Sequence, residues 1–261
     1  MSLLTPIKKI YWRIFVAIDE RLKFPALKKG ETGIQLGFDM SAPVTSDLFL
    51  MAHRVGPGGK VIGIDPDPRN HAIAKSIIEK NNYPVQLMHK AVYDHAGTMT
   101  LLLGEKASWN QLNIFPPDEE VNFQSSTIQV EMQTLDAMVA ENNMDISRIG
   151  HINITVNGAE YGALKGMEHI LSAAENMAIT VIAGRADATG TINGKNDYEA
   201  ISELLQSHGF TTRFVRMEQL FWWGFIVNFL MKRRWIFRRS SYGVVMAVKG
   251  NKKIPFYQSY S

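Results

Sequence analysis

The chain contains no cysteine. This absence excludes disulfide bonds, zinc sites built on thiolates and a cysteine nucleophile. It fits a reducing compartment, and we expect a cytoplasmic location. No run of about 18 uninterrupted apolar residues occurs, so no membrane-spanning helix is expected. Charged residues interrupt the N-terminal segment, which lacks the cleavage site of a secretory signal.

Several sequence signatures of enzymes are also missing. The chain has no Gly-x-Ser-x-Gly motif and no phosphate loop with Gly-Lys-Ser/Thr. No set of histidines and carboxylates has the spacing of metal ligands, so we expect no metal. A nucleotide-binding fold for NAD(P) would need Gly-x-Gly-x-x-Gly after its first strand. Gly37, Asp39 and Ala42 stand at those three positions, which disfavours that class.

The composition is otherwise that of an ordinary globular protein. The chain has 261 residues, of which 46% are hydrophobic and 20% are charged. This content suffices for a full hydrophobic core and makes global disorder improbable. The length predicts one α/β domain with additions.

The net charge of +3 is distributed unevenly along the chain. Residues 1–29 carry a net charge of +5, residues 30–212 carry −11, and residues 213–261 carry +9. Two basic ends therefore flank an acidic middle, which suggests an anionic partner for the ends. The acidic middle disfavours a broad nucleic-acid footprint, so no nucleic-acid partner is expected.

Both basic ends contain segments suited to a membrane surface. Residues 7–18 predict an amphipathic helix, and we treat 1–29 as a basic N-terminal segment before a main domain at 30–261. An insertion at 218–240 holds twelve nearly continuous apolar residues, followed by five cations among aromatic residues. Segments 7–18 and 220–239 predict peripheral binding to anionic lipid on the inner face of the membrane. A lid helix packed on the sheet remains the alternative for the insertion.

Apolar runs alternate with helical patterns through the main domain. This alternation predicts a doubly wound, mostly parallel sheet with helices on both faces. The expected strands are 33–37, 60–65, 85–92, 99–103, 128–132, 151–156, 178–183, 211–216 and 242–248. The expected helices are 48–55, 71–81, 135–142, 159–174 and a last one through His208 capped by Asp197. We expect a hairpin at 95–97 and a loop over 104–126.

Polar residues follow the first two of these strands. Ligands of open α/β sheets bind beyond the carboxyl ends of the strands. Gly37 lets the backbone approach a ligand, and Asp39 and Ser41 offer polar groups, although a simple tight turn explains this segment equally well. Asp65 can accept hydrogen bonds from both hydroxyls of a ribose. Asp67 before a proline is a helix cap.

A third strand end repeats the pattern. Thr155 and Asn157 share one face of the strand because side chains alternate. Glu160 lies in the first turn of the next helix, where interaction with the helix dipole is the simpler explanation. His89 on its strand is more often structural than catalytic. The segment 108–110 is either a substrate loop or a loop pinned by a buried tryptophan.

Together these segments resemble the motifs of the FkbM methyltransferases. The family pattern Asp-x-Gly-Ala-Asn-x-Gly corresponds to Gln35-Leu-Gly-Phe-Asp-Met-Ser41, and a strand ending in Glu-Pro-x-Pro corresponds to Asp65-Pro-Asp-Pro68. The pattern Lys-Ile-Asp-x-Glu-Gly-x-Glu corresponds to Asn153-Ile-Thr-Val-Asn-Gly-Ala-Glu160, with Leu-Lys-Gly in the following helix. The resemblance runs from about Gly33 to Gly209.

The resemblance implies a seven-stranded methyltransferase sheet with S-adenosylmethionine as cofactor. It implies methyl transfer to a hydroxyl oxygen of a small molecule or glycan. The implied cofactor-binding residues are Gln35, Gly37, Asp39 and Ser41 near the methionine end, Asp65 at the ribose and Ala91 at the adenine. The implied acceptor-side catalytic residues are Thr155, Asn157 and Glu160.

The chain departs from the family pattern at several carboxylates. Gln35, Thr155 and Asn157 stand where the family has acidic residues, and 184–185 are Gly-Arg where it often has Glu and His. Amides and hydroxyls still form hydrogen bonds but cannot act as bases near neutral pH. A non-catalytic nucleoside-binding or interaction protein that keeps the fold is therefore the alternative function.

Overall fold

The computed structural model describes residues 24–41, 43, 46–105, 110–114, 123–183, 191–216 and 243–254. The predictions for segments 7–18 and 220–239, for residues 108–109 and for 184–185 lie outside these residues. None of the helices within the described ranges is long and apolar enough to cross a membrane.

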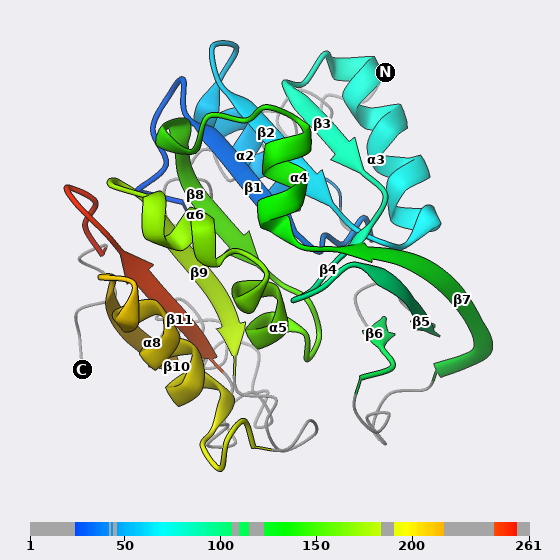
Figure 1. Cartoon of the computed structure of the whole chain (residues 1–261). Coiled ribbons are helices and arrows are strands. Elements are labelled where there is room, and N and C mark those ends of the chain that lie inside the picture. Colours follow the sequence, from blue (N-terminus) through cyan, green and yellow to red (C-terminus); the bar gives the residue numbers. More distant parts are fainter. Residues whose placement is uncertain are drawn as a thin grey trace, which may run out of the picture.

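A seven-stranded sheet forms the centre of the molecule, as predicted (Figure 1). Its order is β10-β11-β9-β8-β1-β2-β3. The strands are β1 (Thr32–Leu36), β2 (Lys60–Ile64), β3 (Val85–Met88), β8 (Ile149–Ile154), β9 (Ala178–Ala183), β10 (Thr211–Arg216) and β11 (Gly243–Val248). β1 pairs in parallel with both β2 and β8, whereas β11 is antiparallel to β9 and β10. The switch point of the doubly wound sheet therefore lies between β1 and β8.

The central strands are short apolar runs because helices cover both of their faces. All six residues of β8 are buried, as are the last four of β1 and of β2. Burial of this kind contributes about 1.5–3 kcal/mol for each large aliphatic side chain. The central strands thus fix the carboxyl edge of the sheet rigidly.

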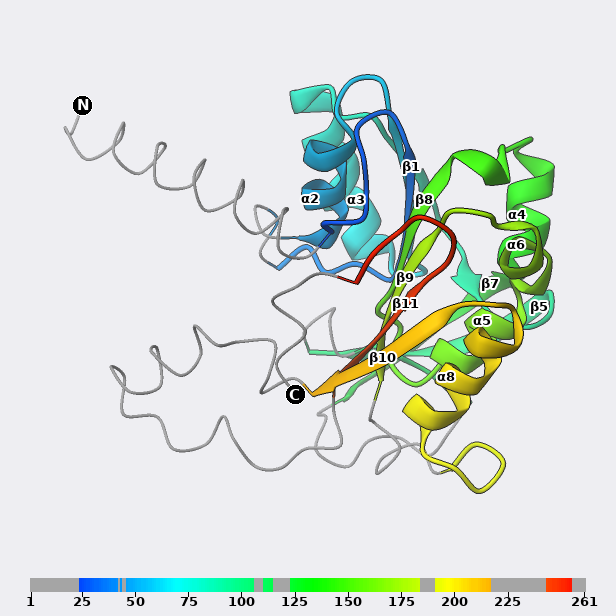
Figure 2. The ribbon, with the colours of Figure 1, turned by 90° about the vertical axis from the view of Figure 1, so that its left-hand side faces the viewer.

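The helices divide between the two faces of the sheet (Figure 2). One face carries α2 (Asp47–Val55) and α3 (Pro68–Asn81), whose apolar side chains pack with Phe24 and Leu27. The other face carries α4 (Leu135–Glu141), α5 (Glu160–Lys165), α6 (Glu168–Ala173) and α8 (Asp197–Ser207). A 3-10 turn, η3 (Ile146–Arg148), precedes β8.

The single helix expected over 159–174 is wrong, because the chain forms α5 and α6 instead. At the break, Asp136 of α4 accepts hydrogen bonds from the backbone N–H groups of His169 and Ile170, at 2.8 and 2.9 Å. A carboxylate from another element therefore caps a new helix start. A side chain at Gly166 would overlap the carbonyl of Tyr93, so this crossing point requires glycine. Similarly, Asn196 rather than Asp197 is the N-cap of α8.

A second, four-stranded sheet was not predicted. Its order is β4-β7-β5-β6, with β4 (Ala91–Val92), β5 (Gly97–Gly104), β6 (Gln111–Leu112) and β7 (Phe123–Gln133). The expected strand 85–92 is split between the two sheets. The expected hairpin at 95–97 is wrong, because β4 and β5 both pair with β7 and not with each other. The expected loop over 104–126 contains β6 and the start of β7.

Candidate active site

A cavity of about 240 Å³ lies at the carboxyl ends of β1, β2 and β8. The second sheet supplies part of its wall. The lining residues are Gly37, Phe38, Asp39, Ile64, Asp65, Pro66, Lys90, Ala91, Val92, Leu101, Asn110, Leu112, Thr155, Val156, Asn157, Ala159, Glu160, Ile182 and Asp197. Seven of the nine predicted site residues are in this set. The two others do not line the cavity: Gln35 is buried and Ser41 is exposed, and each makes a hydrogen bond to a residue that lines it.

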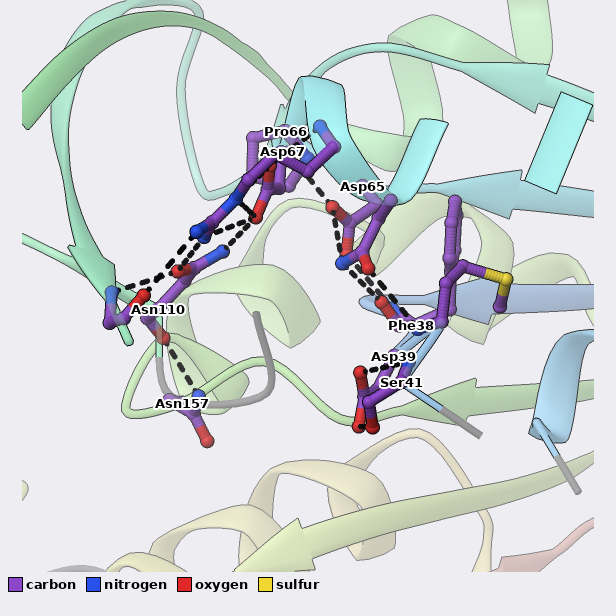
Figure 3. A network of polar contacts seen from close by, with 12 residues as sticks. Phe38, Asp39, Ser41, Asp65, Pro66, Asp67, Asn110 and Asn157 are labelled. Atoms are coloured by element: carbon purple, nitrogen blue, oxygen red, sulfur yellow. Dashed lines mark hydrogen bonds and ion pairs between the residues drawn. The ribbon is translucent and has the colours of Figure 1, made fainter. Parts of the chain in front are cut away.

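Asp65 follows β2 and is held at the cavity by backbone donors (Figure 3). Its Oδ2 accepts the N–H of Phe38 at 2.9 Å, and its Oδ1 accepts the N–H of Asp67 at 2.8 Å. The residue is only 6% exposed. Burial raises the pKa of Asp65 to about 7 even though these hydrogen bonds favour the carboxylate. Oδ1 also accepts Nδ2 of Asn70 at 3.4 Å, whereas Oδ2 accepts from Phe38 and retains acceptor capacity for a ligand hydroxyl.

The loop after β1 is fixed by an asparagine of α3 that the sequence analysis did not single out. Asn70 donates from Nδ2 to the carbonyl of Phe38 at 2.6 Å and accepts the N–H of Met40 at 3.1 Å. Asn70 and Ala74 are the buried residues of α3. Their spacing of four residues places the Asn70 amide on the buried face of the helix. A polar residue at such a position is the sequence feature that could have indicated a role for Asn70.

Gly37 is the turning point of that loop. Its φ is +69°, and a side chain there would overlap the carbonyl of Thr155. Only glycine adopts this conformation without cost while allowing so close a contact. The loop after β1 is therefore pressed against the segment that follows β8.

Asp39 reaches the cavity from the same loop. Its Oδ1 accepts the N–H of Ser41 at 2.8 Å, and its Oδ2 accepts the Ser41 hydroxyl at 2.6 Å. Ser41 is exposed and does not line the cavity. Its contact with the site is thus made through the carboxylate that it orients (Figure 3).

The hydrogen bonds of Gln35 in β1 require an amide and not a carboxylate. The side chain is fully buried, and its Nε2 donates to the carbonyl of Gly37 at 2.6 Å and to Thr155 Oγ1 at 3.0 Å. Its Oε1 accepts Nδ2 of Asn153 at 2.7 Å. A carboxylate could not make the two donor contacts. The hydroxyl of Thr155 in turn donates to the Gly37 carbonyl at 2.7 Å.

The neutral network continues across the sheet. Thr180 of β9 donates to Oδ1 of Asn153 at 2.5 Å, and Nε2 of His151 lies 3.0 Å from the Thr180 hydroxyl. Burial, with the nearby charge of Lys252, lowers the pKa of His151 to about 3. The imidazole is therefore neutral at pH 7. A chain of uncharged side chains thus links three strands beneath the loop after β1, and Asn153 also donates to Oδ2 of Asp47 in α2 at 3.1 Å.

A charged cluster braces the opposite side of the cavity (Figure 3). Asn110 donates from Nδ2 to Asp67 Oδ2 at 2.6 Å and accepts Nη2 of Arg69 at 3.0 Å. Its backbone carbonyl accepts Nδ2 of Asn157 at 2.7 Å. Burial opposes ionisation of Asp67, but the hydrogen bonds from Arg69 and Asn110 hold its pKa below the usual value. The brace joins the carboxyl end of β2 to the segment after β8.

Two buried carboxylates line the end of the cavity near β9. Glu160 begins α5 and Asp197 begins α8, and each is less than 9% exposed. Ile182 of β9 lies in the same wall. From the sequence, Asp197 is expected only as a helix cap. Asp197 lies well beyond the end of β9, so no strand-end pattern in the sequence indicates it as a site residue.

A lysine just before the second sheet also belongs to the site, and it was not predicted from the sequence. Lys90 lines the cavity, and its Nζ donates to Glu131 at 2.5 Å and Gln133 at 2.8 Å, both in β7. Ala91 follows it and is 2% exposed. His89 instead lies with Nε2 at 2.9 Å from the carbonyl of Pro66 and does not line the cavity. Over the described ranges, no three or more histidines and carboxylates are grouped to hold a metal ion.

Comparison with known proteins identifies the family. The family model described as the methyltransferase FkbM domain matches residues 34–212. No curated protein matches the chain. Among solved structures, a SAM-dependent methyltransferase from Aquifex aeolicus is 14% identical, with 88% of this chain and 87% of that chain covered and a TM-score of 0.42.

Two further solved structures are similarly distant. Fibrillarin from Aeropyrum pernix, with bound S-adenosyl-L-methionine, is 10% identical, with 90% and 74% of the two chains covered and a TM-score of 0.45. An O-methyltransferase from Bacillus cereus, in complex with SAH, is 13% identical, with 89% and 80% covered and a TM-score of 0.44. The family match extends over well more than half of the sequence, and the chain therefore belongs to the FkbM methyltransferase family.

Proposed function

We propose that the protein transfers a methyl group from S-adenosylmethionine to a hydroxyl oxygen of a small molecule or glycan. The observation that carries this proposal is Asp65, a buried carboxyl fixed by two backbone N–H groups at the wall of the cavity. A carboxylate at the end of the second strand is suited to hold both hydroxyls of a ribose. It lies beside the Gly37 turn, where the backbone permits close approach of a ligand.

The other cofactor contacts follow from the order of strands along the carboxyl edge. Ala91, with its small side chain, is proposed to contact the adenine. Gly37 and Asp39 are proposed to contact the methionine end, with Ser41 orienting the Asp39 carboxylate and Gln35 holding the Gly37 carbonyl. S-adenosylmethionine supplies an electrophilic methyl group on a sulfonium sulfur.

The acceptor is proposed to bind between Asn157 and Glu160, with Asp197 beside them. Transfer is an in-line displacement, so alignment of the acceptor oxygen with the methyl carbon is the main task of the protein. The acceptor oxygen forms the new bond to carbon, and the electrons of the broken carbon–sulfur bond remain on sulfur. Glu160 is proposed to receive the hydroxyl proton, because a carboxylate can accept a proton near neutral pH whereas the hydroxyl of Thr155 and the amide of Asn157 cannot.

Calorimetric titration with S-adenosylhomocysteine tests the proposal. We expect the wild type to bind, and Asp65→Ala to bind about 10–100-fold more weakly because charge-assisted hydrogen bonds are lost. A panel of hydroxylated acceptors is then assayed by release of S-adenosylhomocysteine, with Glu160→Gln as the variant that retains cofactor binding. Absence of binding by the wild type at high protein concentration would remove the methyltransferase proposal.

The alternative is a protein that binds the nucleoside without turnover. It is favoured by the engagement of Thr155 and Asn157 in hydrogen bonds with the protein itself. Tight binding of S-adenosylhomocysteine, with no product from any acceptor, would support it. An acceptor-dependent rate that falls in Glu160→Gln would exclude it.

We further propose peripheral association with anionic lipid through segments 7–18 and 220–239. The support is the basic and aromatic pattern of the sequence. The measurement is co-sedimentation with anionic vesicles at low and high salt. The wild type should pellet at low salt, and a variant with Trp222, Trp223, Arg233 and Arg234 all replaced by alanine should not. Equal, negligible pelleting of both proteins would favour the alternative, in which the insertion at 218–240 is a lid helix packed on the sheet.

A further inference from the structure

The carbonyl of Gly37 is already occupied by protein donors. A carbonyl oxygen has two lone pairs. Gln35 Nε2 donates to this oxygen at 2.6 Å, and the Thr155 hydroxyl donates to it at 2.7 Å. Both lone pairs are therefore engaged before any ligand binds. A cationic ligand group approaching the turn needs another acceptor.

The neighbouring backbone of the loop is also hydrogen-bonded to the protein, although within the described part of the chain the Phe38 carbonyl accepts a single donor, the side chain of Asn70 on α3. The N–H of Phe38 donates to Asp65 at 2.9 Å, and its carbonyl accepts from Asn70 at 2.6 Å. The N–H of Met40 also donates to Asn70. The loop is thus held by hydrogen bonds from the protein, and Asp39 is the one ionisable residue among its members that line the cavity, which are Gly37, Phe38 and Asp39.

The Asp39 carboxylate is fixed but retains acceptor capacity. Ser41 provides one donor to each of its oxygens. A carboxylate offers about four lone-pair positions, so at least one remains on each oxygen. In Figure 3, Asp39 lies across the central space from Asn157, and Asp65 lies between the loop and the start of α3.

We infer that the Asp39 carboxylate, rather than a loop carbonyl, binds the α-ammonium group of S-adenosylmethionine. This inference rests on the proposed function and assigns one charge of that cofactor to one residue. The ion pair makes the site selective for ligands that carry the ammonium group. Ser41 acts as a positioning residue, because it contacts the carboxylate from outside the cavity.

Three ligands and two variants test the inference by calorimetric titration. The ligands are S-adenosylhomocysteine, its analogue lacking the α-amino group, and 5′-methylthioadenosine, which lacks the whole amino-acid end. Asp39→Asn removes the charge with little change of shape. Glu79→Gln is the matched control, since Glu79 is exposed near the opposite end of α3 from the cavity.

We expect Asp39→Asn to weaken S-adenosylhomocysteine binding at least about tenfold and to change methylthioadenosine binding by less than about twofold. The deaminated analogue, which keeps its carboxylate, should bind the variant as well as or better than it binds the wild type. Glu79→Gln should match the wild type with every ligand. Agreement on all three ligands supports the ion pair.

Other outcomes overturn the inference in distinguishable ways. Unchanged affinity of Asp39→Asn for S-adenosylhomocysteine means that another group binds the ammonium. Equal weakening of all three ligands means that Asp39 only holds the loop. If the variant fails to fold, a wild type that does not distinguish S-adenosylhomocysteine from its deaminated analogue overturns it instead. A wild type that binds neither S-adenosylhomocysteine nor methylthioadenosine refutes the proposed function itself.

Discussion

Asp65→Asn should change how the stability of the protein depends on pH. The folded pKa of Asp65 is about 7 and its model value is 3.8. Between these values the folded state holds a proton that the unfolded state has lost, so this group lowers the free energy of unfolding as pH rises. The difference is close to three pH units, at about 1.4 kcal/mol each, which gives a ceiling of about 4 kcal/mol.

His151 has the opposite effect on how the free energy of unfolding depends on pH. Its folded pKa is about 3 and its model value is 6.5, so the unfolded state binds the extra proton between them. This group therefore raises the free energy of unfolding as pH rises to 6.5. From about pH 4 to pH 6.5 the two contributions nearly cancel in the wild type. In Asp65→Asn the contribution of His151 is no longer opposed. The free energy of unfolding of the variant should therefore rise with pH by about 1.4 kcal/mol per pH unit relative to the wild type.

The assay is denaturant unfolding followed by far-ultraviolet circular dichroism at pH 4.5, 5.5 and 6.5. An asparagine accepts only one of the two backbone bonds made by Asp65, which costs about 1–3 kcal/mol at every pH. The slope of the difference between variant and wild type is therefore the readout. Between pH 4.5 and pH 6.5, the free energy of unfolding of the variant should rise by about 3 kcal/mol relative to that of the wild type. Parallel profiles for Asp65→Asn and wild type would refute the raised pKa, and Glu79→Gln should run parallel.

Other substitutions test the remaining parts of the site, each by unfolding and by titration with S-adenosylhomocysteine. Gly37→Ala should cost about 2 kcal/mol or more and abolish binding, because the residue has a positive φ and abuts Thr155; wild-type binding by this variant would contradict the close approach. Gln35→Glu should cost about 3 kcal/mol, because a buried carboxylate cannot donate to the Gly37 carbonyl; unchanged stability would show that the neutral network is unimportant. Asn110→Ala should cost about 1–2 kcal/mol through loss of its bond to Asp67, and an unaffected melting temperature would argue against the brace.

The sequence predicted the central sheet because its signals are local. Short apolar runs end at Gly37 and Asp65, and each is followed by a helical pattern. The same rule brought Asp39, Asp65, Asn157 and Glu160 to one cavity, since carboxyl ends of parallel strands share an edge.

The second sheet could not be predicted in the same way. β4 has only two residues, and it is recognised by its pairing with β7, about forty residues later. Lys90, Leu101 and Leu112 therefore reach the cavity through contacts that no local pattern encodes.

The roles of the substituted carboxylates also needed the structure. From sequence, Gln35 and Thr155 indicate a loss of charge and of catalytic groups. In three dimensions they are members of one neutral network that holds the Gly37 carbonyl. The first motif of the family pattern has an aspartate and an asparagine. This chain has Gln35 at the position of the aspartate and Asp39 at the position of the asparagine. In this chain the motif therefore has an uncharged amide beneath the loop and the carboxylate Asp39 at the cavity.

A crystal structure with S-adenosylhomocysteine tests the central claim most directly. We predict that both ribose hydroxyls lie within hydrogen-bonding distance of Asp65, that the amino-acid end lies beside Gly37 and Asp39, and that the sulfur faces Asn157 and Glu160. Failure to obtain the ligand in this cavity at saturating concentration, or a ribose bound away from Asp65, would contradict the account.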